Sequence, residues 1–343
     1  MTQDKLLSEE DLEERLSRPT EADMAAMKSL EGDLLILGVG GKMGPSLARR
    51  ARRAADIADA SKRIIAVARF SNQALIQQLQ STGIETITGD LLDPGALEAL
   101  PDVANVVFMA ARKFGTTGSE HLTWALNTYL PGRVAERFRN SRIVAFSTGN
   151  VYPLRPLAQG GAVESVPPEP IGEYAQSALG RERMFEYGAA CWGTPVAILR
   201  LNYAVELRYG VLLDIGLAVF EGRPVNVRMG LVNVIWQGDA NSLCLQSIAH
   251  CASPPNILNI TGPETLSVRY IAERFAGLFG VTPLFDGDET GSALLNNATK
   301  AHQLFGYPSV TIGQMIEWIA DWITRGGSTL HKPTHFDVQD GKF

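Results

Sequence analysis

The chain has 343 residues, of which 45% are hydrophobic and 20% charged, and this composition indicates a folded globular protein. Its net charge of −6 provides no general attraction to nucleic acid or to an anionic membrane surface, so neither is expected as a partner. Three cysteines without a C-x-x-C pair favour a reducing cytoplasm, and the apolar runs are far too short for a membrane span.

The first half of the chain predicts a layered α/β domain. Residues 1–31 predict a helical extension of two short polar helices separated by Pro19, with Ser8 and Thr20 as N-caps. Over 32–200, short β-branched runs then alternate with helical stretches, which is typical of a parallel sheet covered on both faces. The sequence therefore predicts a Rossmann-type, doubly wound parallel sheet. The expected strands are 33–40, 63–70, 85–89, 105–111 and 142–148.

The second half is less regular, and we assign 201–326 mainly to a smaller α/β lobe and 327–343 to a tail. Two further strands are expected at 195–202 and 256–260, so the sheet would also receive later segments. A Pro-rich stretch, 153–172, predicts a long loop of the kind that often covers a site. Helices are expected within 212–222, 238–250, 267–280 and 311–323.

A glycine-rich loop follows the first expected strand. In "LGVGGKMGPS", Gly38, Gly41 and Gly44 stand three residues apart and open a helix. A pyrophosphate can bind the unpaired N–H groups at such a helix start, where a Cβ would block its approach, and the last glycine lets helix and strand pack closely. This strand–loop–helix context favours a dinucleotide site over a glycine-rich turn without function.

The end of the second strand bears on the choice of cofactor. An NAD site usually has an acid there for the ribose diol, whereas this sequence has Arg69 in "VARFSN". We expect Arg69, with Lys42 from the glycine loop, to meet a 2′-phosphate; the alternative is that both are solvated surface residues. NADP is therefore expected in preference to NAD, with Asp90 near the adenine edge.

The order of these motifs resembles the extended short-chain dehydrogenase/reductase family, in its NAD(P)-dependent epimerase/dehydratase group, over about 33–325. "GVGGKMG" is similar to the family's G-x-x-G-x-x-G, "GDLLD" follows the third strand, "MAA" closes the fourth, and "STGNVYP" resembles the family's serine/threonine segment. The resemblance implies that residues 201–326 form a substrate lobe. The expected cofactor contacts are Gly38, Gly41, Lys42, Met43, Gly44, Arg69, Asp90, Leu91, Ala110, Ala111, Asn127 and Tyr174.

The resemblance also implies a catalytic pair. Tyr174 would be the general acid/base and Thr148 would bind the substrate oxygen, but Ala178 replaces the family's lysine four residues after the tyrosine. A phenol needs a nearby cation to favour its ionised form. Arg181, two turns along the helix, is a poor substitute, whereas Lys113 follows the fourth strand at the edge where nicotinamide should lie. Otherwise the charge of oxidised nicotinamide suffices, or the protein binds cofactor without turnover as a regulator or sensor.

The expected function is hydride transfer between nicotinamide and a hydroxyl/carbonyl of a sugar, polyol or sugar acid. A nucleotide-sugar is the alternative, because "LVNVIWQGDAN" lacks the arginine and "RLNYAVELRYG" the Gly-Pro of members that act on nucleotide-sugars. Candidate substrate contacts are Asn150, Asn202 and Arg208; Arg208 suits a carboxylate, but a salt bridge with Glu206 competes.

Two further expectations concern metals and assembly. His331 and His335 are separated by Pro333 and have no third ligand nearby, so no metal is expected. The helices assigned to 120–138 and 174–190 resemble the pair through which family members dimerise, which implies a homodimer.

Overall fold

The computed structural model describes residues 5–113, 115 and 118–341, so the outermost residues of the predicted extension and tail lie outside it. Seven strands form one parallel sheet in the order β12-β7-β5-β4-β1-β2-β3. The predicted doubly wound sheet is confirmed, with a last strand from far along the chain. The strands are β1 (Leu34–Leu37), β2 (Ile64–Ala68), β3 (Glu85–Thr88), β4 (Asn105–Phe108), β5 (Arg142–Thr148), β7 (Val196–Leu201) and β12 (Asn256–Ile260).

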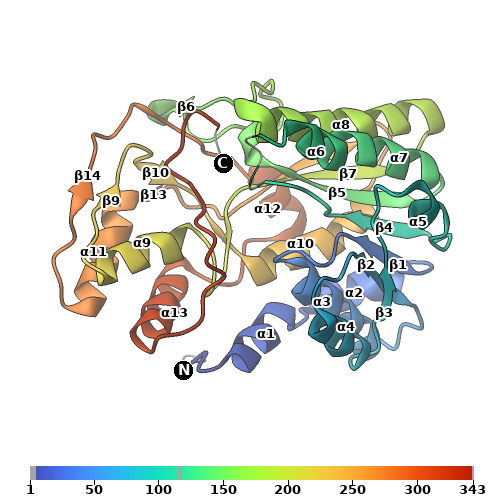
Figure 1. Cartoon of the computed structure of the whole chain (residues 1–343), viewed down its shortest axis with the longest axis horizontal. Helices are drawn as coiled ribbons and strands as arrows, with labels where there is room; N and C mark the ends of the chain where they lie inside the picture. The colour runs from blue at the N-terminus through green and yellow to red at the C-terminus, as the bar shows by residue number, and fades with distance from the viewer. Residues whose placement is uncertain (1–4, 114, 116–117, 342–343) are drawn as a thin grey trace.

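Helices cover both faces of this sheet (Figure 1). Successive side chains of a strand point to opposite faces. Thus Leu34 and Ile36 of β1 pack in one buried cluster, while Leu35 and Leu37 pack in another. This is why the central strands are apolar throughout rather than alternating. One face carries α2 (Glu21–Ser29), α3 (Gly44–Ile57), α4 (Gln73–Gln80) and α10 (Gln237–Ser247); the other carries α5 (Pro94–Glu98), α6 (Glu120–Trp124), α7 (Leu130–Arg137) and α8 (Gly172–Trp192).

The N-terminal extension is part of the packed structure. Ser8 and Thr20 cap α1 (Glu9–Ser17) and α2, as predicted, and each forms a reciprocal capping box. Leu12 and Leu16 of α1 are fully buried in the core of the second lobe. The carboxylate of Asp23 in α2 pairs with the buried Arg50 guanidinium at 2.6 Å. The extension therefore stabilises both halves of the molecule.

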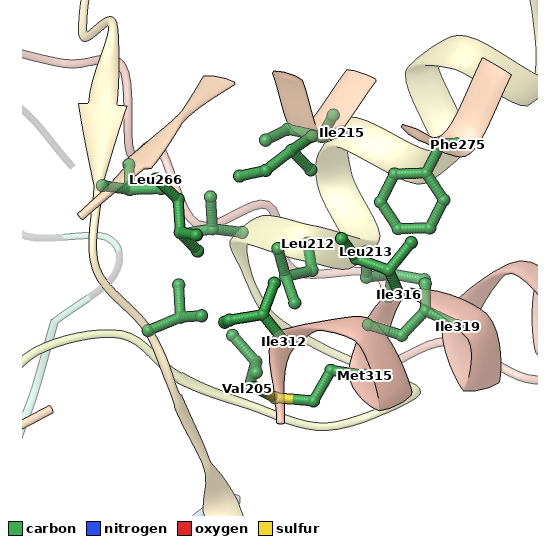
Figure 2. Packing of buried hydrophobic residues seen from close by; sticks show 14 of the residues in the cluster. Val205, Leu212, Leu213, Ile215, Leu266, Phe275, Ile312, Met315, Ile316 and Ile319 are labelled. Atoms are coloured by element: carbon green, nitrogen blue, oxygen red, sulfur yellow. The ribbon is translucent and has the colours of Figure 1, made fainter. Parts of the chain in front are cut away.

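The second lobe is built around three helices, α9 (Val211–Phe220), α11 (Val268–Phe279) and α13 (Ile312–Thr324). Figure 2 shows Leu213 of α9 among Ile316 and Ile319 of α13, with Phe275 of α11 beside them. The lobe also contains α12 (Thr299–Phe305) and short strand pairs formed by β8 (Ala204–Val205), β9 (Val225–Asn226), β10 (Leu231–Val232), β11 (Ile235–Trp236), β13 (Leu266–Ser267) and β14 (Phe285–Asp286). The Pro-rich loop contributes β6 (Arg155–Pro156), which pairs with β15 (Ser292–Ala293).

The sheet topology determines where a ligand can bind. From β1 the chain proceeds outward to β2 and β3 and then returns to β4 on the other side of β1. A crevice forms at the carboxyl ends of the two strands where the order reverses. The tail runs across the space between sheet and second lobe, as the red trace in Figure 1 shows. Among the helices of the described residues, none has the length and apolar character needed to cross a membrane.

Candidate active site

The glycine loop lies in the crevice between β1 and β4. Gly38 has a φ of +91°, and a Cβ there would lie 2.5 Å from the backbone nitrogen of Ala110. A Cβ on Gly44, where α3 begins, would lie 2.1 Å from the Val39 carbonyl oxygen. Among the described residues no side chain caps α3, and its first turn carries no acid. The Gly44 N–H is bonded to the Gly41 carbonyl oxygen and Pro45 has no N–H, so the remaining N–H groups of the loop and first turn are those that can receive an anion. With them the loop fits a dinucleotide pyrophosphate.

A cavity of about 710 Å³, here the Arg69 cavity, lies over the ends of β1 to β4. Arg69 is exposed and, among the described residues, makes no hydrogen bond or ion pair. Asp90 accepts the N–H of Leu92 at 3.0 Å through one carboxylate oxygen. The lining of this cavity includes seven of the residues expected to contact cofactor: Gly38, Gly41, Arg69, Asp90, Leu91, Ala110 and Ala111.

Asn127 requires a correction, because it was expected to contact the cofactor directly. It is fully buried in the π-helical segment Ala125–Tyr129 and lines neither of the two main cavities. Its amide donates to the Arg112 carbonyl and to Ser177 Oγ, and its oxygen accepts the Arg112 N–H. Because these bonds satisfy the buried amide, Asn127 holds the loop after β4 in place.

A second cavity of about 670 Å³, here the Tyr174 cavity, joins sheet domain, second lobe and tail. Thr148 ends β5, and Tyr174 lies in the first turn of α8. The Thr148 hydroxyl donates to Asn150 Oδ1 at 3.1 Å and accepts the Asn150 N–H at 3.2 Å. The fold thus brings the six predicted catalytic and substrate-binding residues, from separate segments of the chain, into one cavity: Lys113, Thr148, Asn150, Tyr174, Asn202 and Arg208.

Lys113 lies beside the phenol of Tyr174. Its ammonium nitrogen is 6.0 Å from the centre of the tyrosine ring and donates to the carbonyl oxygen of Thr334 at 3.2 Å. Burial lowers the pKa of Lys113 to about 8, and the carboxylate of Asp214 partly opposes this shift. The residue is therefore a cation near neutral pH that loses its charge more easily than an exposed lysine does.

Position 178, four residues after Tyr174 in α8, is enclosed by other side chains. Ala178 is fully buried in a small cluster with Val151, Tyr152 and Ala162. Arg181, one turn further, donates to the Phe146 carbonyl and to Asn127 Oδ1. Its buried guanidinium is therefore occupied in holding the sheet and the helix together.

Lys42 also requires a correction. We expected its ammonium beside Arg69, but it donates to the carbonyl oxygen of Ala204 at 2.8 Å and lies 4.1 Å from the centre of the Tyr209 ring. It lines the Tyr174 cavity and not the Arg69 cavity, and burial lowers its pKa to about 7. The side chain turns toward the second lobe because its partners lie there.

Arg208 was expected to bind a substrate carboxylate, with a salt bridge as the competing possibility. Its guanidinium contacts Glu13 at 2.7 Å and Glu206 at 3.2 Å. The salt bridge is confirmed, while Arg208 also lines the Tyr174 cavity, so its contact with a substrate stays a prediction. One partner, Glu13, comes from the N-terminal extension.

Two groups of supporting residues have little signal in the sequence. Beneath the site, Arg200 of β7 pairs with Glu182 of α8 at 2.7 Å, and Glu182 accepts the Ser147 hydroxyl. These bonds fix the strand that ends in Thr148 to the helix that carries Tyr174. A charged residue within the apolar "VAILRLN" was the one available clue. In the tail, the N–H and hydroxyl of Thr334 both donate to Asp214 of α9. No periodic pattern in the sequence predicts that contact.

The chain can now be compared with known proteins. The model of the NAD dependent epimerase/dehydratase family matches residues 34–205, half of the chain. A comparison with curated protein sequences finds no match.

Similar solved structures share the fold. The UDP-glucuronic acid 4-epimerase from Bacillus cereus, in complex with UDP-glucuronic acid and NAD, is 18% identical with a TM-score of 0.70, over 85% of this chain and 99% of that one. The UDP-glucose 4-epimerase from Thermus thermophilus, in complex with NAD, is 18% identical with a TM-score of 0.68, over 84% and 98%. The UDP-glucose 4-epimerase from Thermotoga maritima with UDP-glucose is 15% identical with a TM-score of 0.69, over 86% and 99%.

Proposed function

The chain belongs to the NAD dependent epimerase/dehydratase family, and on that premise we propose an NAD(P)-dependent oxidoreductase or epimerase that acts on a hydroxyl/carbonyl pair of a sugar-type substrate. One observation carries this proposal. Thr148, Tyr174 and Lys113 come from three different elements and line one cavity that the glycine loop also lines. A hydroxyl, a phenol and an ammonium in that arrangement suit proton exchange at a substrate oxygen.

Each of these residues has a distinct role in the proposal. When bound, the nicotinamide exchanges a hydride at its C4 with the substrate carbon. Thr148 donates a hydrogen bond to the substrate oxygen, and Tyr174 accepts or returns the proton of that oxygen. The ammonium of Lys113 favours the ionised phenol. Ala178 has no charge and cannot do this.

The proposed cofactor is NADP in preference to NAD. Support comes from Arg69, whose exposed guanidinium lines the Arg69 cavity, whereas Lys42 no longer contributes. The Bacillus and Thermus structures named above contain NAD, so the opposite preference is the alternative. Titration with NADPH and NADH, following nicotinamide fluorescence, separates the two: Arg69→Ala should weaken NADPH binding and leave NADH binding unchanged.

The proposed substrate is a small sugar, polyol or sugar acid, with Asn150 and Asn202 as polar contacts. Beyond Asn150 and Tyr203, a small cavity of about 30 Å³ remains, walled partly by His335 and Val338 of the tail. This space suits little more than a water molecule. A nucleotide-sugar is the runner-up, because the similar epimerases bind UDP-sugars. In addition, a cavity of about 500 Å³, here the Asp214 cavity, shares Arg208 and Lys332 with the Tyr174 cavity.

The enzymatic proposal is tested by turnover. Purified protein with NADP or NAD is screened against sugars, sugar acids and UDP-sugars, with Tyr174→Phe and Thr148→Val as variants. Losing a general acid/base costs about 10²- to 10⁴-fold in rate. Cofactor binding without any turnover would instead favour the second candidate, a cofactor-binding regulator, for which the burial of Ala178 is the supporting observation.

A homodimer in the cytoplasm completes the proposal. Large apolar side chains are exposed along the segments that resemble the family's dimerising pair, and clustered exposed apolar groups mark protein interfaces. The three cysteines are free, which suits a reducing compartment. The exposed side chains are Leu122, Trp124, Tyr129 and Tyr187.

A further inference from the structure

The tail is anchored on both sides of the crevice. The N–H of Leu330 donates to the Arg208 carbonyl at 3.0 Å, and Thr334 is bonded to Asp214 of α9. From the sheet domain, the ammonium of Lys113 donates to the Thr334 carbonyl. In Figure 1 the tail passes between the two halves of the molecule, and its last described residue, Gly341, packs against Gly172 at the start of α8. The backbone around residue 332 is therefore held between two anchor points.

Lys332 stands where the Arg69 cavity meets the Tyr174 cavity, and it also lines the Asp214 cavity. Of the described residues that line both the Arg69 cavity and the Tyr174 cavity, Lys332 is the one that carries a charge. Within the part of the chain that the structure describes, its exposed side chain makes no hydrogen bond or ion pair. The residues common to the two cavities are Gly40, Gly41, Asn72, Leu75, Ala111 and Lys332.

A dinucleotide has a characteristic distribution of charge along its length. Its adenosine and nicotinamide nucleoside ends are joined by a pyrophosphate that carries the negative charge. With adenosine in the Arg69 cavity and nicotinamide near Tyr174, the pyrophosphate would cross the junction of the two cavities. The glycine loop supplies backbone N–H groups on one side of that junction, and Lys332 supplies an ammonium.

We propose that Lys332 of the tail binds the pyrophosphate of the cofactor together with the glycine loop. This inference rests on the proposed function, since it takes the ligand of the crevice to be a dinucleotide. It assigns the tail a part in cofactor binding that the motif at residues 38–44 does not contain. Because both cofactors have the same pyrophosphate, Lys332 contributes equally to NADH and NADPH binding, unlike Arg69.

The test measures dissociation constants of the full chain for NADH, NADPH and ADP-ribose at two salt concentrations. Lys332→Ala should raise all three about tenfold, which corresponds to about 1.4 kcal/mol, and should flatten their salt dependence. Lys332→Arg should retain most of the affinity. The control is Lys28→Ala, which removes one exposed positive charge from α2, away from the cavities described above.

The possible outcomes separate this inference from the proposed function. Wild-type binding with a uniform loss in Lys332→Ala supports both. Wild-type binding that Lys332→Ala leaves unchanged, with the same salt dependence, overturns the role of Lys332 alone. Wild-type protein that binds none of the three ligands overturns the proposed function and this inference with it. Thermal unfolding of the ligand-free variant should match wild type, because the side chain is exposed.

Discussion

The ammonium nitrogen of Lys113, on the loop after β4, lies 6.0 Å from the centre of the Tyr174 ring on α8. Sixty-one positions along the chain separate the two residues, and the cation therefore reaches the phenol from a different element. An i+4 lysine on the same helix would need the space that Val151 and Tyr152 occupy around Ala178. This geometry is the basis of the proposal that Lys113 supplies the cation that Ala178 cannot.

Removing this cation is the first prediction. Lys113→Ala should lower kcat by about 10- to 100-fold, equivalent to about 1.4–2.7 kcal/mol of barrier, because the phenolate loses its nearby charge. Thermal unfolding should change little, because losing the hydrogen bond to the Thr334 carbonyl is offset by removing a buried ammonium that is costly to desolvate. Steady-state kinetics and a melting curve measure the two effects. Equal rates in variant and wild type would exclude Lys113 from the mechanism.

The second prediction concerns pH. The pKa of Lys113 is lowered to about 8, so the residue is charged below that pH and neutral above it. The rate should therefore fall as pH rises through about 8, until it approaches the rate of Lys113→Ala. A pH profile of kcat between about 6 and 10 measures this fall.

Two variants are controls for the alkaline fall in rate. Asp214 raises the pKa of Lys113 through its negative charge, so Asp214→Asn should move the fall to lower pH. Lys113→Arg retains its charge throughout this range and should remove the fall. An alkaline fall that stays in place in both variants would show that another group titrates there.

The third prediction is that the family's lysine cannot simply be restored. Ala178→Lys places a long charged side chain where the alanine is fully buried against Tyr152 and Ala162. We expect the free energy of unfolding to drop by at least about 1–3 kcal/mol from overpacking alone. The double variant with Lys113→Ala should not recover activity. Urea titration and kinetics measure stability and activity of the double variant. If it recovered activity at wild-type stability, the cluster around Ala178 would have to open toward the Tyr174 cavity.

The fourth prediction concerns the N-terminal extension. Asp23→Ala leaves the guanidinium of Arg50, itself 3% exposed, buried without its carboxylate. Breaking a buried pair in this way costs about 3–5 kcal/mol. Glu14→Ala, which breaks the solvent-accessible pairs with Arg18 and Arg53, should cost no more than about 1 kcal/mol for each pair. Urea unfolding compares the variants, and a similar small loss in both would show that α2 contributes little to stability.

The fifth prediction tests the homodimer by light scattering after size exclusion. Wild type should have twice the mass of one chain. Tyr187→Glu, which places a charge on the exposed aromatic face of α8, should yield monomer. Tyr307→Glu changes a tyrosine that is 74% exposed on another part of the molecule and should remain dimeric. Monomeric wild type, or a dimer that persists in Tyr187→Glu, would argue against this interface.

Much of the fold was predictable because local patterns carried it. The apolar runs around Leu35 and Val107 have both faces buried, so their composition alone indicates covered parallel strands. The glycine loop was equally local, since nearby backbone atoms leave no room for a Cβ at Gly38 or Gly44. Ser8 and Thr20 were recognisable as caps, because a capping box spans only four residues.

By itself, then, the sequence determined the doubly wound sheet, the glycine loop and the candidates Thr148, Tyr174 and Lys113. The tertiary structure decided which side chains remain available to a ligand. Lys42 was assigned to the wrong neighbour because its acceptor, Ala204, lies 162 positions away, and Arg208 meets Glu13 across 195. Periodicity and turn chemistry act over a few residues. A long lysine or arginine side chain instead bonds to an oxygen that the packing of distant segments places nearby. The same physics places Thr334 and Lys332 in the crevice, from a tail that has no pattern of its own.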